Sequence, residues 1–520
     1  MSKTACAFGR NMAQQPFRGT FEVKMQLPLP ASLPTDADII IVGAGPAGMS
    51  ASVALAQAGR KVIVLDMQAR PGGQIYRGLE ANLAAGRETL ELMDALGPTY
   101  AAGEAVIRAF RKTPGIDFRP RHTVWEVRRD GTIGWLQGNR AGYLRADHVV
   151  LANGAMERPV PFPGWTLPGV MTAGAVQTLL KAGRLKPDGR VVLAGTGPLI
   201  FLLADQLRML GVRPVLLART DLLRNQLAAL PHLRFAALGP VAKGLGWLAR
   251  LRLARIPVRS GVTGIEALGQ DRVEGVRVWQ GDRATDVACD LLIVHDGIVP
   301  SIDLAQGAGL RIGWNDALQA WQPATTEDGS AVPEDGSSLT EGPCNILISG
   351  DARCIGGADA AIAHGRHLAA VLLGGKSDEP QTLAKVRQSL VPRPFLEAAF
   401  PPGLSAALPT GATTVCRCEE IPTTALQDLL RAGAQDINHV RGLSRCGMGP
   451  CQGRNCAITL ARMIAAETGV KPVPFRARPP VRPLPLQALA ALAGVDPRLA
   501  EVVSLEDKPQ VAAVVRATDV

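Results

Sequence analysis

Five of the nine cysteines in this 520-residue chain lie between residues 416 and 456. They are Cys416, Cys418, Cys446, Cys451 and Cys456. The spacings C-x-C and C-x4-C hold sulfurs in two tight turns, and four thiolates arranged in pairs are the ligands that a [2Fe–2S] cluster needs. Structural zinc more often uses C-x2-C turns, and buried free thiols are the third interpretation. Because Cys446 and Cys451 repeat the spacing of Cys451 and Cys456, the sequence alone permits either set of four.

A glycine turn near the N-terminus has the spacing that binds a dinucleotide. Gly43, Gly45 and Gly48 follow an apolar run at 38–42, and a helical stretch and a second strand at 61–66 come after them. In such a βαβ unit the first glycine permits the turn, the second lets the backbone approach a pyrophosphate, and the third lets helix and strand pack closely. The helix N-terminus offers amide hydrogens to the anion. Asp66 ends the second strand, where we expect it to accept a hydrogen bond from a ribose hydroxyl.

The stretch 188–219 repeats this order with Gly195 and Gly197. Ile200 replaces the third glycine, and no acidic residue ends the second strand. Arg219 ends that strand instead and is a candidate for a salt bridge with the 2′-phosphate of NADPH. Three interpretations are open for this second site: it binds NAD(P), it binds another adenine nucleotide, or it retains only the fold.

Three more segments resemble flavoproteins with two dinucleotide-binding domains. Gly350 and Asp351 follow the apolar run 346–349, as in the segment that closes the FAD domain of that class. The resemblance implies that Asp351 accepts a hydrogen bond from the ribityl chain and that the next helix directs its N-terminus at the flavin pyrimidine. It also implies that Gly154 lies where the chain leaves the FAD domain, and that the loop containing Gly73 and Gln74 runs along the isoalloxazine. We therefore expect FAD at the first glycine turn.

The composition excludes several classes of protein. With 47% apolar and 20% charged residues the chain is neither disordered nor fibrous, and its length predicts several packing units. The net charge of +10 would suit nucleic acid, but the basic residues are scattered and only 4% of residues are aromatic, so nucleic acid is not an expected partner. We expect no transmembrane segment and no secretory signal. The cysteines then indicate metal in a reducing compartment rather than disulfides.

The cysteine segment resembles the bacterioferritin-associated-ferredoxin-like [2Fe–2S] domain. Residues 415–420 and 441–456 match its signature C-R-C-E … G-M-G-x-C-Q-G-x-x-C. The resemblance implies that the four ligands are Cys416, Cys418, Cys451 and Cys456. It leaves Cys446 as a spare thiol beside them.

Joined to the two nucleotide turns, this domain makes the chain similar to the α-type FAD/[2Fe–2S] subunits of heteromeric dye-linked amino-acid dehydrogenases. The A-type subunit of opine oxidase, the B-type subunit of hydrogen cyanide synthase and D-hydroxyproline dehydrogenase belong to that family. The implied fold class is α/β: a two-dinucleotide-binding-domain flavoprotein with nested Rossmann-like domains, plus the small [2Fe–2S] domain. The expected parts are an N-terminal extension (1–35), an FAD domain (36–160 and 289–375), an NAD(P)-like domain (161–288), a linker (376–410), the cluster domain (411–470) and a Pro-rich tail (471–520).

The resemblance implies an electron-transfer subunit. In the family, an amino-acid-type substrate such as an opine, proline, D-hydroxyproline or glycine is oxidised at a C–N bond by a flavin in a separate β subunit. Electrons then pass through FAD and the cluster to a quinone or dye acceptor. The same expectation includes a small ferredoxin-like subunit, together with a cytoplasmic location that is at most peripheral to the inner face of the membrane.

Two alternatives stay open. One is a self-contained NAD(P)H-dependent flavin/iron–sulfur reductase, and the other is a non-catalytic nucleotide-binding scaffold. No catalytic residue is identified, because His295 and His364 have the features of structural histidines.

Overall fold

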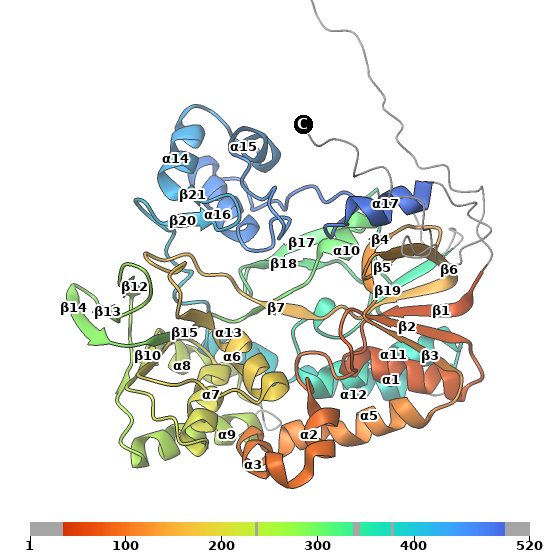
Figure 1. Ribbon diagram of the computed structural model, residues 1–520, viewed down its shortest axis with the longest axis horizontal. Coiled ribbons are helices and arrows are strands. Elements are labelled where there is room, and N and C mark those ends of the chain that lie inside the picture. The colour runs from red at the N-terminus through yellow and green to blue at the C-terminus, as the bar shows by residue number, and fades with distance from the viewer. Residues whose placement is uncertain (1–34, 235–237, 336–343, 376–378, 494–520) are drawn as a thin grey trace, which may run out of the picture.

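The computed structural model describes residues 35–234, 238–335, 344–375 and 379–493. Two α/β units lie side by side in it, and a smaller helical unit lies above the second of them (Figure 1). The expected N-terminal extension falls outside the described residues, apart from its last residue. Among the described residues, we find no helix with the length and hydrophobicity that a transmembrane span requires.

The first unit is built on a seven-stranded sheet. In spatial order its strands are β3 (Ile116–Pro120), β2 (Val62–Asp66), β1 (Ala37–Val42), β6 (Arg140–Leu151), β5 (Thr132–Gln137) and β4 (Thr123–Val127), with β19 (Asn345–Ile348) also paired to β6. The pairs among β3, β2, β1, β6 and β19 are parallel, and β4 and β5 continue from β6 in antiparallel pairs. Since β19 lies almost 200 residues after β6, this unit is discontinuous in sequence.

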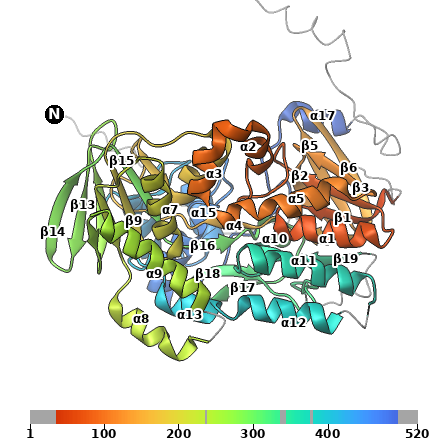
Figure 2. The same cartoon turned by 90° about the horizontal axis from the view of Figure 1, so that it is seen from below.

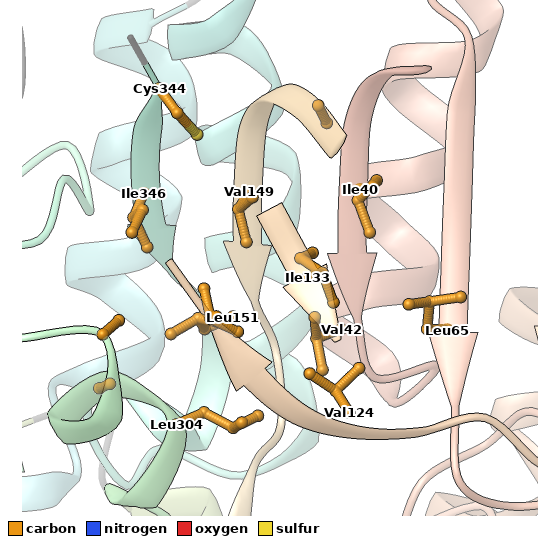
Figure 3. Close-up of a cluster of buried hydrophobic side chains, with 14 of the residues drawn as sticks. Ile40, Val42, Leu65, Val124, Ile133, Val149, Leu151, Leu304, Cys344 and Ile346 are labelled. Carbon is orange, nitrogen blue, oxygen red and sulfur yellow. The ribbon is translucent and has the colours of Figure 1, made fainter. Parts of the chain in front are cut away.

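Helices cover one face of the first sheet, and side chains from the β4–β5 hairpin cover the other. The first layer contains α1 (Pro46–Gln57), α5 (Gly103–Lys112) and α11 (Ala358–Leu372), and the short helices α2 (Leu79–Ala85), α3 (Leu90–Leu96) and α4 (Pro98–Ala101) lie at its margin (Figure 2). On the other face, Ile40, Val149 and Ile346 of three neighbouring strands meet Ile133 of β5 and Leu304 (Figure 3). Burial of these runs on both faces accounts for their unbroken apolar sequence.

The second unit has a five-stranded parallel sheet. In spatial order its strands are β11 (Val258–Arg259), β10 (Leu216–Arg219), β9 (Val191–Gly195), β15 (Leu291–His295) and β8 (Val170–Thr172). Its helices are α6 (Ala173–Thr178), α7 (Pro198–Met209), α8 (Leu223–Ala229) and α9 (Leu238–Leu253), and an antiparallel sheet of β12 (Gly264–Leu268), β13 (Gly275–Gln280) and β14 (Arg283–Ala288) packs on the opposite face. The expected domain boundary at residue 288 differs from the structure, because β15 pairs with β9 and so belongs to this second sheet.

Two antiparallel strands connect the units. The chain leaves the first unit through β7 (Ala155–Glu157) and returns through β16 (Ile298–Pro300), which pairs with it. The return continues into α10 (Asp303–Gly307) and the hairpin of β17 (Ile312–Asn315) and β18 (Ala320–Pro323). These connections bring the carboxyl edges of both parallel sheets toward the middle of the molecule (Figure 1).

The segment expected as a linker is largely helical. It forms α12 (Glu379–Leu390), which runs beside α11, and α13 (Arg393–Ala399), which packs on α8. Pro392 is the N-cap of α13 and Pro394 lies in its first turn, where a missing amide hydrogen costs no helical hydrogen bond. Pro392 and Pro394 therefore mark a helix start, and the part of the expected linker without helices is limited to residues after Phe400.

The small unit contains the clustered cysteines. It consists of β20 (Thr414–Cys416), β21 (Ile421–Pro422), α14 (Thr423–Arg431), α15 (Ile437–Ser444) and α16 (Ala457–Thr468). The following stretch is extended up to α17 (Leu486–Ala493), which lies near β4, β5 and β6 of the first unit (Figure 1). Two contacts attach it on the way: Trp321 Nε1 donates to Pro472 O at 3.0 Å and Val481 N donates to Trp125 O at 2.9 Å. The tail therefore joins the cysteine unit to the first sheet.

Candidate functional site

The three glycines of the first turn have different structural roles. Gly43 has φ +111°, and a Cβ there would lie 2.4 Å from Ala152 O. A Cβ on Gly48 would lie 1.9 Å from Gly43 O, which is why α1 can begin so close to β1. Gly45 is different, because its nearest neighbour would be Gly73 Cα at 3.8 Å. Gly43 and Gly48 are required by packing, whereas Gly45 leaves an open place beside the helix N-terminus.

The structure brings the other residues predicted for the first site to the same edge. The loop with Gly73 and Gln74 crosses the turn, and a Cβ on Gly73 would lie 2.9 Å from Gly45 Cα. Gly350, after β19, lies against Ala47 of α1, where a Cβ would come within 2.7 Å of the Ala47 Cβ. Gly154 follows β6 with φ +70° and no neighbour within 4 Å. Carboxyl ends of β1, β6 and β19 thus surround one cradle.

The two acids predicted for this site also bind backbone. Asp66 Oδ2 accepts from Ala44 N at 2.6 Å and its Oδ1 accepts from Gln68 N at 2.7 Å. Burial raises the pKa of Asp66, against the lowering effect of these amide donors. Asp351 Oδ1 accepts from Gly356 N at 2.8 Å and from Gly357 N at 3.0 Å, at the start of α11. Each carboxylate therefore holds a loop of the cradle in shape, in addition to the ribose or ribityl contact expected of it.

The second glycine turn also has glycines with positive φ angles, but its neighbours differ from those of the first turn. Gly195 has φ +137°, and a Cβ there would lie 1.7 Å from His295 O on the neighbouring strand. Gly197 has φ +90°, and a Cβ on it would lie 4.0 Å from the His295 ring. Ile200, in the first turn of α7, is fully buried, so close packing here is achieved with a large side chain. The hydroxyl of Thr196, between the glycines, is buried and has no hydrogen-bond partner in the described part of the chain.

Arg219 is not available to a nucleotide phosphate in this structure. Its guanidinium binds both carboxylate oxygens of Asp221, and it lies over the ring of Phe201 with 4.8 Å to the centroid. Arg219 is 6% exposed and Asp221 is 2% exposed. The proposed contact with a 2′-phosphate would require this buried pair to open, which is costly because it leaves an unpaired charge. The geometry therefore does not favour NADPH at the second site.

A strap, residues 400–405, crosses the carboxyl edge of the second sheet. Phe400 packs with the side chains on the α7 face, and Leu404 packs with those on the opposite face. Between them, Asp296 accepts from Gly403 N, Leu404 N and Ser405 N at 2.8, 2.9 and 2.9 Å. Asp296 directly follows β15 and is fully buried. The strap lies where a dinucleotide would cross such a sheet.

A histidine–carboxylate pair that the sequence did not suggest lies beside the second turn. Glu157 Oε1 is 2.6 Å from His295 Nδ1, and Glu157 Oε2 accepts from Gly174 N at 2.7 Å. The two residues are 138 positions apart, on β7 and β15. His364, the other histidine considered, is buried in α11 and burial lowers its pKa to about 4. Both histidines are therefore buried inside the fold.

The five clustered cysteines form two groups. Cys416, Cys446 and Cys456 are buried, and their sulfurs lie within 4.8 Å of one another. Hydrogen bonds from Cys446 and Cys456 lower the pKa of Cys416 to about 2, and the same contact raises the pKa of Cys446 to about 12. Cys418 and Cys451 are partly exposed and interact with each other. The structure thus groups Cys416 with Cys446 and Cys456, and Cys418 with Cys451, instead of pairing the two sulfurs within each turn as the spacing predicted.

Phe475, from the tail, closes the cysteine turns. A Cβ on Gly447 would lie 2.6 Å from its ring, and one on Gly453 would lie 2.5 Å from it. A Cβ on Gly449 would lie 2.3 Å from the Cys418 Cβ. These glycines are therefore required by the packing of the turns. The contact of Phe475 with the cysteine turns was not predicted, and a single aromatic residue in a Pro-rich stretch was the only signal for it.

Two α/β units, one inserted in the other and each with a glycine turn at the carboxyl ends of its parallel strands, define an oxidoreductase with two dinucleotide-binding domains. The model of the pyridine nucleotide-disulphide oxidoreductase family matches residues 37–328, and the model of the sarcosine oxidase A3 domain matches residues 411–493. The chain belongs to this oxidoreductase family and, within it, to the α-type oxidase subunits that include the A-type subunit of opine oxidase, which confirms the family predicted from the sequence. It is therefore an oxidoreductase subunit.

The relatives cover nearly the whole chain. The A-type subunit of opine oxidase from Agrobacterium tumefaciens (strain Ach5) is 39% identical over 88% of this chain and 92% of its own length. The HcnB subunit of hydrogen cyanide synthase from Pseudomonas aeruginosa is 33% identical over 87% of this chain and 98% of its own length. Among solved structures, L-proline dehydrogenase from P. horikoshii has a TM-score of 0.61 at 19% identity, covering 87% of this chain and 79% of that chain. The last similarity concerns the fold alone.

Proposed function

We propose that this chain is the FAD- and [2Fe–2S]-containing electron-transfer subunit of a heteromeric oxidase. In that complex an amino-acid-type C–N bond is oxidised and the electrons reach a quinone or dye acceptor. The observation that carries the proposal is the presence, in one chain, of an open dinucleotide cradle and a group of paired cysteine thiols. A two-electron flavin next to a one-electron centre is suited to splitting hydride chemistry into single-electron transfers.

The residues of the first cradle fit FAD. Gly45 leaves room for a pyrophosphate at the N-terminus of α1, where the amide groups and the helix dipole favour an anion. The Gly73–Gln74 loop would lie along the isoalloxazine. Asp66 would accept a hydrogen bond from the ribose of FAD, and Asp351 would accept one from its ribityl chain. α11, which begins at Ala358 after Gly357, has its N-terminus on the same edge. When bound, the flavin supplies the electron-accepting ring, and these residues orient it and exclude water from it.

The residues of the cysteine unit fit a [2Fe–2S] cluster. Each iron of such a cluster takes two thiolates, and Cys418 with Cys451 forms one pair of interacting sulfurs. Cys416 with Cys456 forms the second pair, and Cys446 is a fifth thiol in contact with it. The low pKa of Cys416 favours the thiolate form that a metal binds. A bound cluster would supply a one-electron carrier, which these thiolates hold in place.

The assembly is proposed from the relatives, whose names describe subunits of oxidases and of hydrogen cyanide synthase. We infer a catalytic β subunit that carries the substrate pocket, and a further partner in a small ferredoxin-like subunit. The second nucleotide site is proposed to retain the fold without a bound nucleotide, because the strap and the Arg219–Asp221 pair occupy its edge.

Cysteine substitutions test the cluster. Cys451→Ser is expected to remove the visible absorbance, the iron and the acid-labile sulfide of the cluster while FAD remains bound, and Cys354→Ser is the matched control outside the group. Cys446→Ser is expected to keep the cluster, with a dithionite-reduced EPR signal like that of the unchanged protein. An unchanged spectrum in Cys451→Ser would exclude the cluster at this position. Loss of the cluster in Cys446→Ser but not in Cys456→Ser would move the fourth ligand to Cys446.

The alternative of a self-contained reductase is tested with nicotinamides. If the strap prevents a nicotinamide from binding at the second site, NADH or NADPH added under anaerobic conditions should leave the flavin absorbance unchanged on the timescale of turnover. Rapid bleaching by either would support the reductase instead. A scaffold without redox function predicts that turnover of the complex survives when Gly45 is replaced by valine.

A further inference from the structure

Six exposed leucines lie on α8, on the turn after it and on α9, and none of them takes part in the sites above. The two helices lie next to each other at one end of the second unit, with the cysteine unit on its opposite side (Figure 1 and Figure 2). We call this surface, residues 222–234 and 238–255, the α8–α9 face. Between 45% and 84% of each leucine side chain is exposed: Leu223, Leu227, Leu230, Leu238, Leu245 and Leu253.

The exposed leucines follow helical spacing. Leu223, Leu227 and Leu230 are four and three positions apart, so they lie on one face of α8 and of the turn that continues it. Leu238 and Leu245 are seven positions apart and share one face of α9. Other side chains of the same helices are buried: Ala229, Leu248 and Leu251. Single exposed leucines are ordinary, but two aligned rows of them indicate a face that another surface covers.

The same part of the chain has an excess of positive charge. No acidic residue occurs between Asp221 and Glu266, whereas seven arginines and lysines do. Among the described residues, only one of the seven forms an ion pair, which joins Arg250 to Asp205 at 2.8 Å. Five others are exposed and have no acid within ion-pair distance in the described structure: Arg224, Arg234, Lys243, Arg252 and Arg255. The exposed leucines and the uncompensated charges thus lie on the same two helices and their adjoining turns.

This composition fits a lipid surface better than a protein surface. Protein interfaces are enriched in aromatic residues and methionine, but the exposed large apolar residues of the α8–α9 face are all leucines. Helices that lie on a bilayer combine leucines, which enter the acyl boundary, with arginines and lysines, which reach anionic headgroups. Neither helix is long and apolar enough to cross a bilayer, so the contact would be confined to the interface.

We propose that the α8–α9 face docks on a membrane surface that contains anionic phospholipid, with its leucines in the acyl boundary and its basic side chains against the phosphate groups. Charge complementarity selects this occupant, because the uncompensated arginines and lysines would repel another basic surface, including the same face of a second copy. The inference does not rest on the proposed function, since no cysteine and no residue of the two glycine turns belongs to this face.

Sedimentation of the purified full-length chain with sucrose-loaded vesicles tests the proposal. The vesicles contain either phosphatidylcholine alone or phosphatidylcholine with about one third phosphatidylglycerol, which is anionic. We expect binding to the anionic vesicles to be at least about tenfold tighter, because several basic side chains reach the charged surface. This preference should shrink as salt is added, since dissolved ions screen exposed charges.

Two pairs of substitutions separate the apolar part of the contact from the charged part. Leu223→Gln combined with Leu227→Gln should weaken binding to anionic vesicles at least about tenfold, because in the unchanged chain both side chains leave water on binding. Lys243→Gln combined with Arg252→Gln should weaken it by a similar factor, since each positive charge near an anionic bilayer contributes about fivefold.

The matched controls are exposed residues outside this face, Leu443→Gln on the cysteine unit and Arg140→Gln at the start of β6. Both should bind as the unchanged chain does, and thermal melting shows whether each variant folds. Absence of binding to anionic vesicles would overturn the proposal and favour an acidic protein surface as the occupant. Equal binding to both kinds of vesicle would show that the basic residues have no part in it. Binding that is unchanged in both pairs of variants would place the membrane contact elsewhere on the chain.

Discussion

Gly403 lies so close to Thr220 that a Cβ on the glycine would come within 2.1 Å of the threonine hydroxyl oxygen. Thr220 follows β10, the strand whose end normally meets the adenosine ribose in a dinucleotide-binding sheet. The Thr220 hydroxyl is buried without a hydrogen-bond partner in the described part of the chain. The strap therefore packs directly on the place that a nucleotide would use.

Gly403→Ala should lower the free energy of unfolding by about 1–3 kcal/mol, the usual cost of overpacking a tight contact. The added methyl group must displace Thr220 or lift the strap from Asp296. Gly442→Ala, at an exposed helical position with no neighbour within 4 Å, is the control and should be neutral or slightly stabilising. Urea unfolding measures both. Equal stability of Gly403→Ala and the unchanged chain would mean that the strap is not tightly packed.

The first glycine turn allows nucleotide binding to be separated from folding. Gly45 has φ −76°, and the place of its Cβ is free of close contacts, so Gly45→Ala should fold normally. Its methyl group would point into the proposed pyrophosphate position, and we expect FAD affinity to fall at least about tenfold. Gly43→Ala should instead fail to fold stably, because both its φ and its contact with Ala152 O forbid a side chain. Flavin retention on dialysis and thermal melting distinguish the two outcomes. Tight FAD binding in Gly45→Ala would contradict this use of the turn.

Sequence patterns could predict the features that depend on neighbours along the chain. The glycine turns and the strands that precede them follow local spacing, and the structure has them where the spacing puts them, whereas the sulfurs of Cys416 and Cys418 lie in different groups. Contacts between distant segments carry no such pattern. Asp296 holds a strap more than 100 residues later, and Glu157 meets His295 across 138 positions. The position of β15 was missed for the same reason, since only its pairing with β9 shows which sheet it joins.

The Arg219 interpretation shows how a local pattern can mislead. A basic residue at the end of a second strand is typical of an NADPH site, but Asp221 is only two residues away and takes both guanidinium contacts. In an extended stretch, residues two apart lie on the same side, so the pair was within reach of sequence reasoning. Its burial was not, because that depends on Phe201 and on the strap.

Phe475→Ala should destabilise the cysteine unit by about 3–5 kcal/mol, as for other buried phenylalanines. The ring is 6% exposed, fills the space above Gly447 and Gly453, and lies beneath Arg441 with 5.2 Å to its centroid. Phe475→Leu should cost less, because it retains most of the buried volume. Limited proteolysis of the cysteine unit measures the effect. A protease-resistant unit in Phe475→Ala would show that the tail is not part of its core.

A buried lysine makes stability depend on pH above neutrality. Lys181 is 8% exposed, and its amine contacts Gln74 O at 3.4 Å and Gln177 Oε1 at 3.2 Å, neither of which is charged. Burial, aided by the charge of Arg77, lowers the pKa of Lys181 to about 8 from its ordinary 10.5. Between these two values the unfolded chain holds a proton that the folded chain has lost. The Lys181 contribution to the free energy of unfolding therefore rises with pH across that window.

Lys181→Met removes this titration, so the stability of the variant relative to the unchanged chain should fall steadily as pH rises through that window. Below pH 8 the variant has the advantage, since it no longer buries a charged amine. Urea unfolding at a series of pH values measures the difference, and Lys112→Met, at an exposed lysine of α5, is the control whose difference should stay constant. Parallel pH curves for Lys181→Met and the unchanged chain would mean that the amine keeps its proton in the fold. In that case the charged amine of Lys181 would hold the Gln74 loop through Gln74 O, and Lys181→Met should weaken FAD binding because it removes that contact.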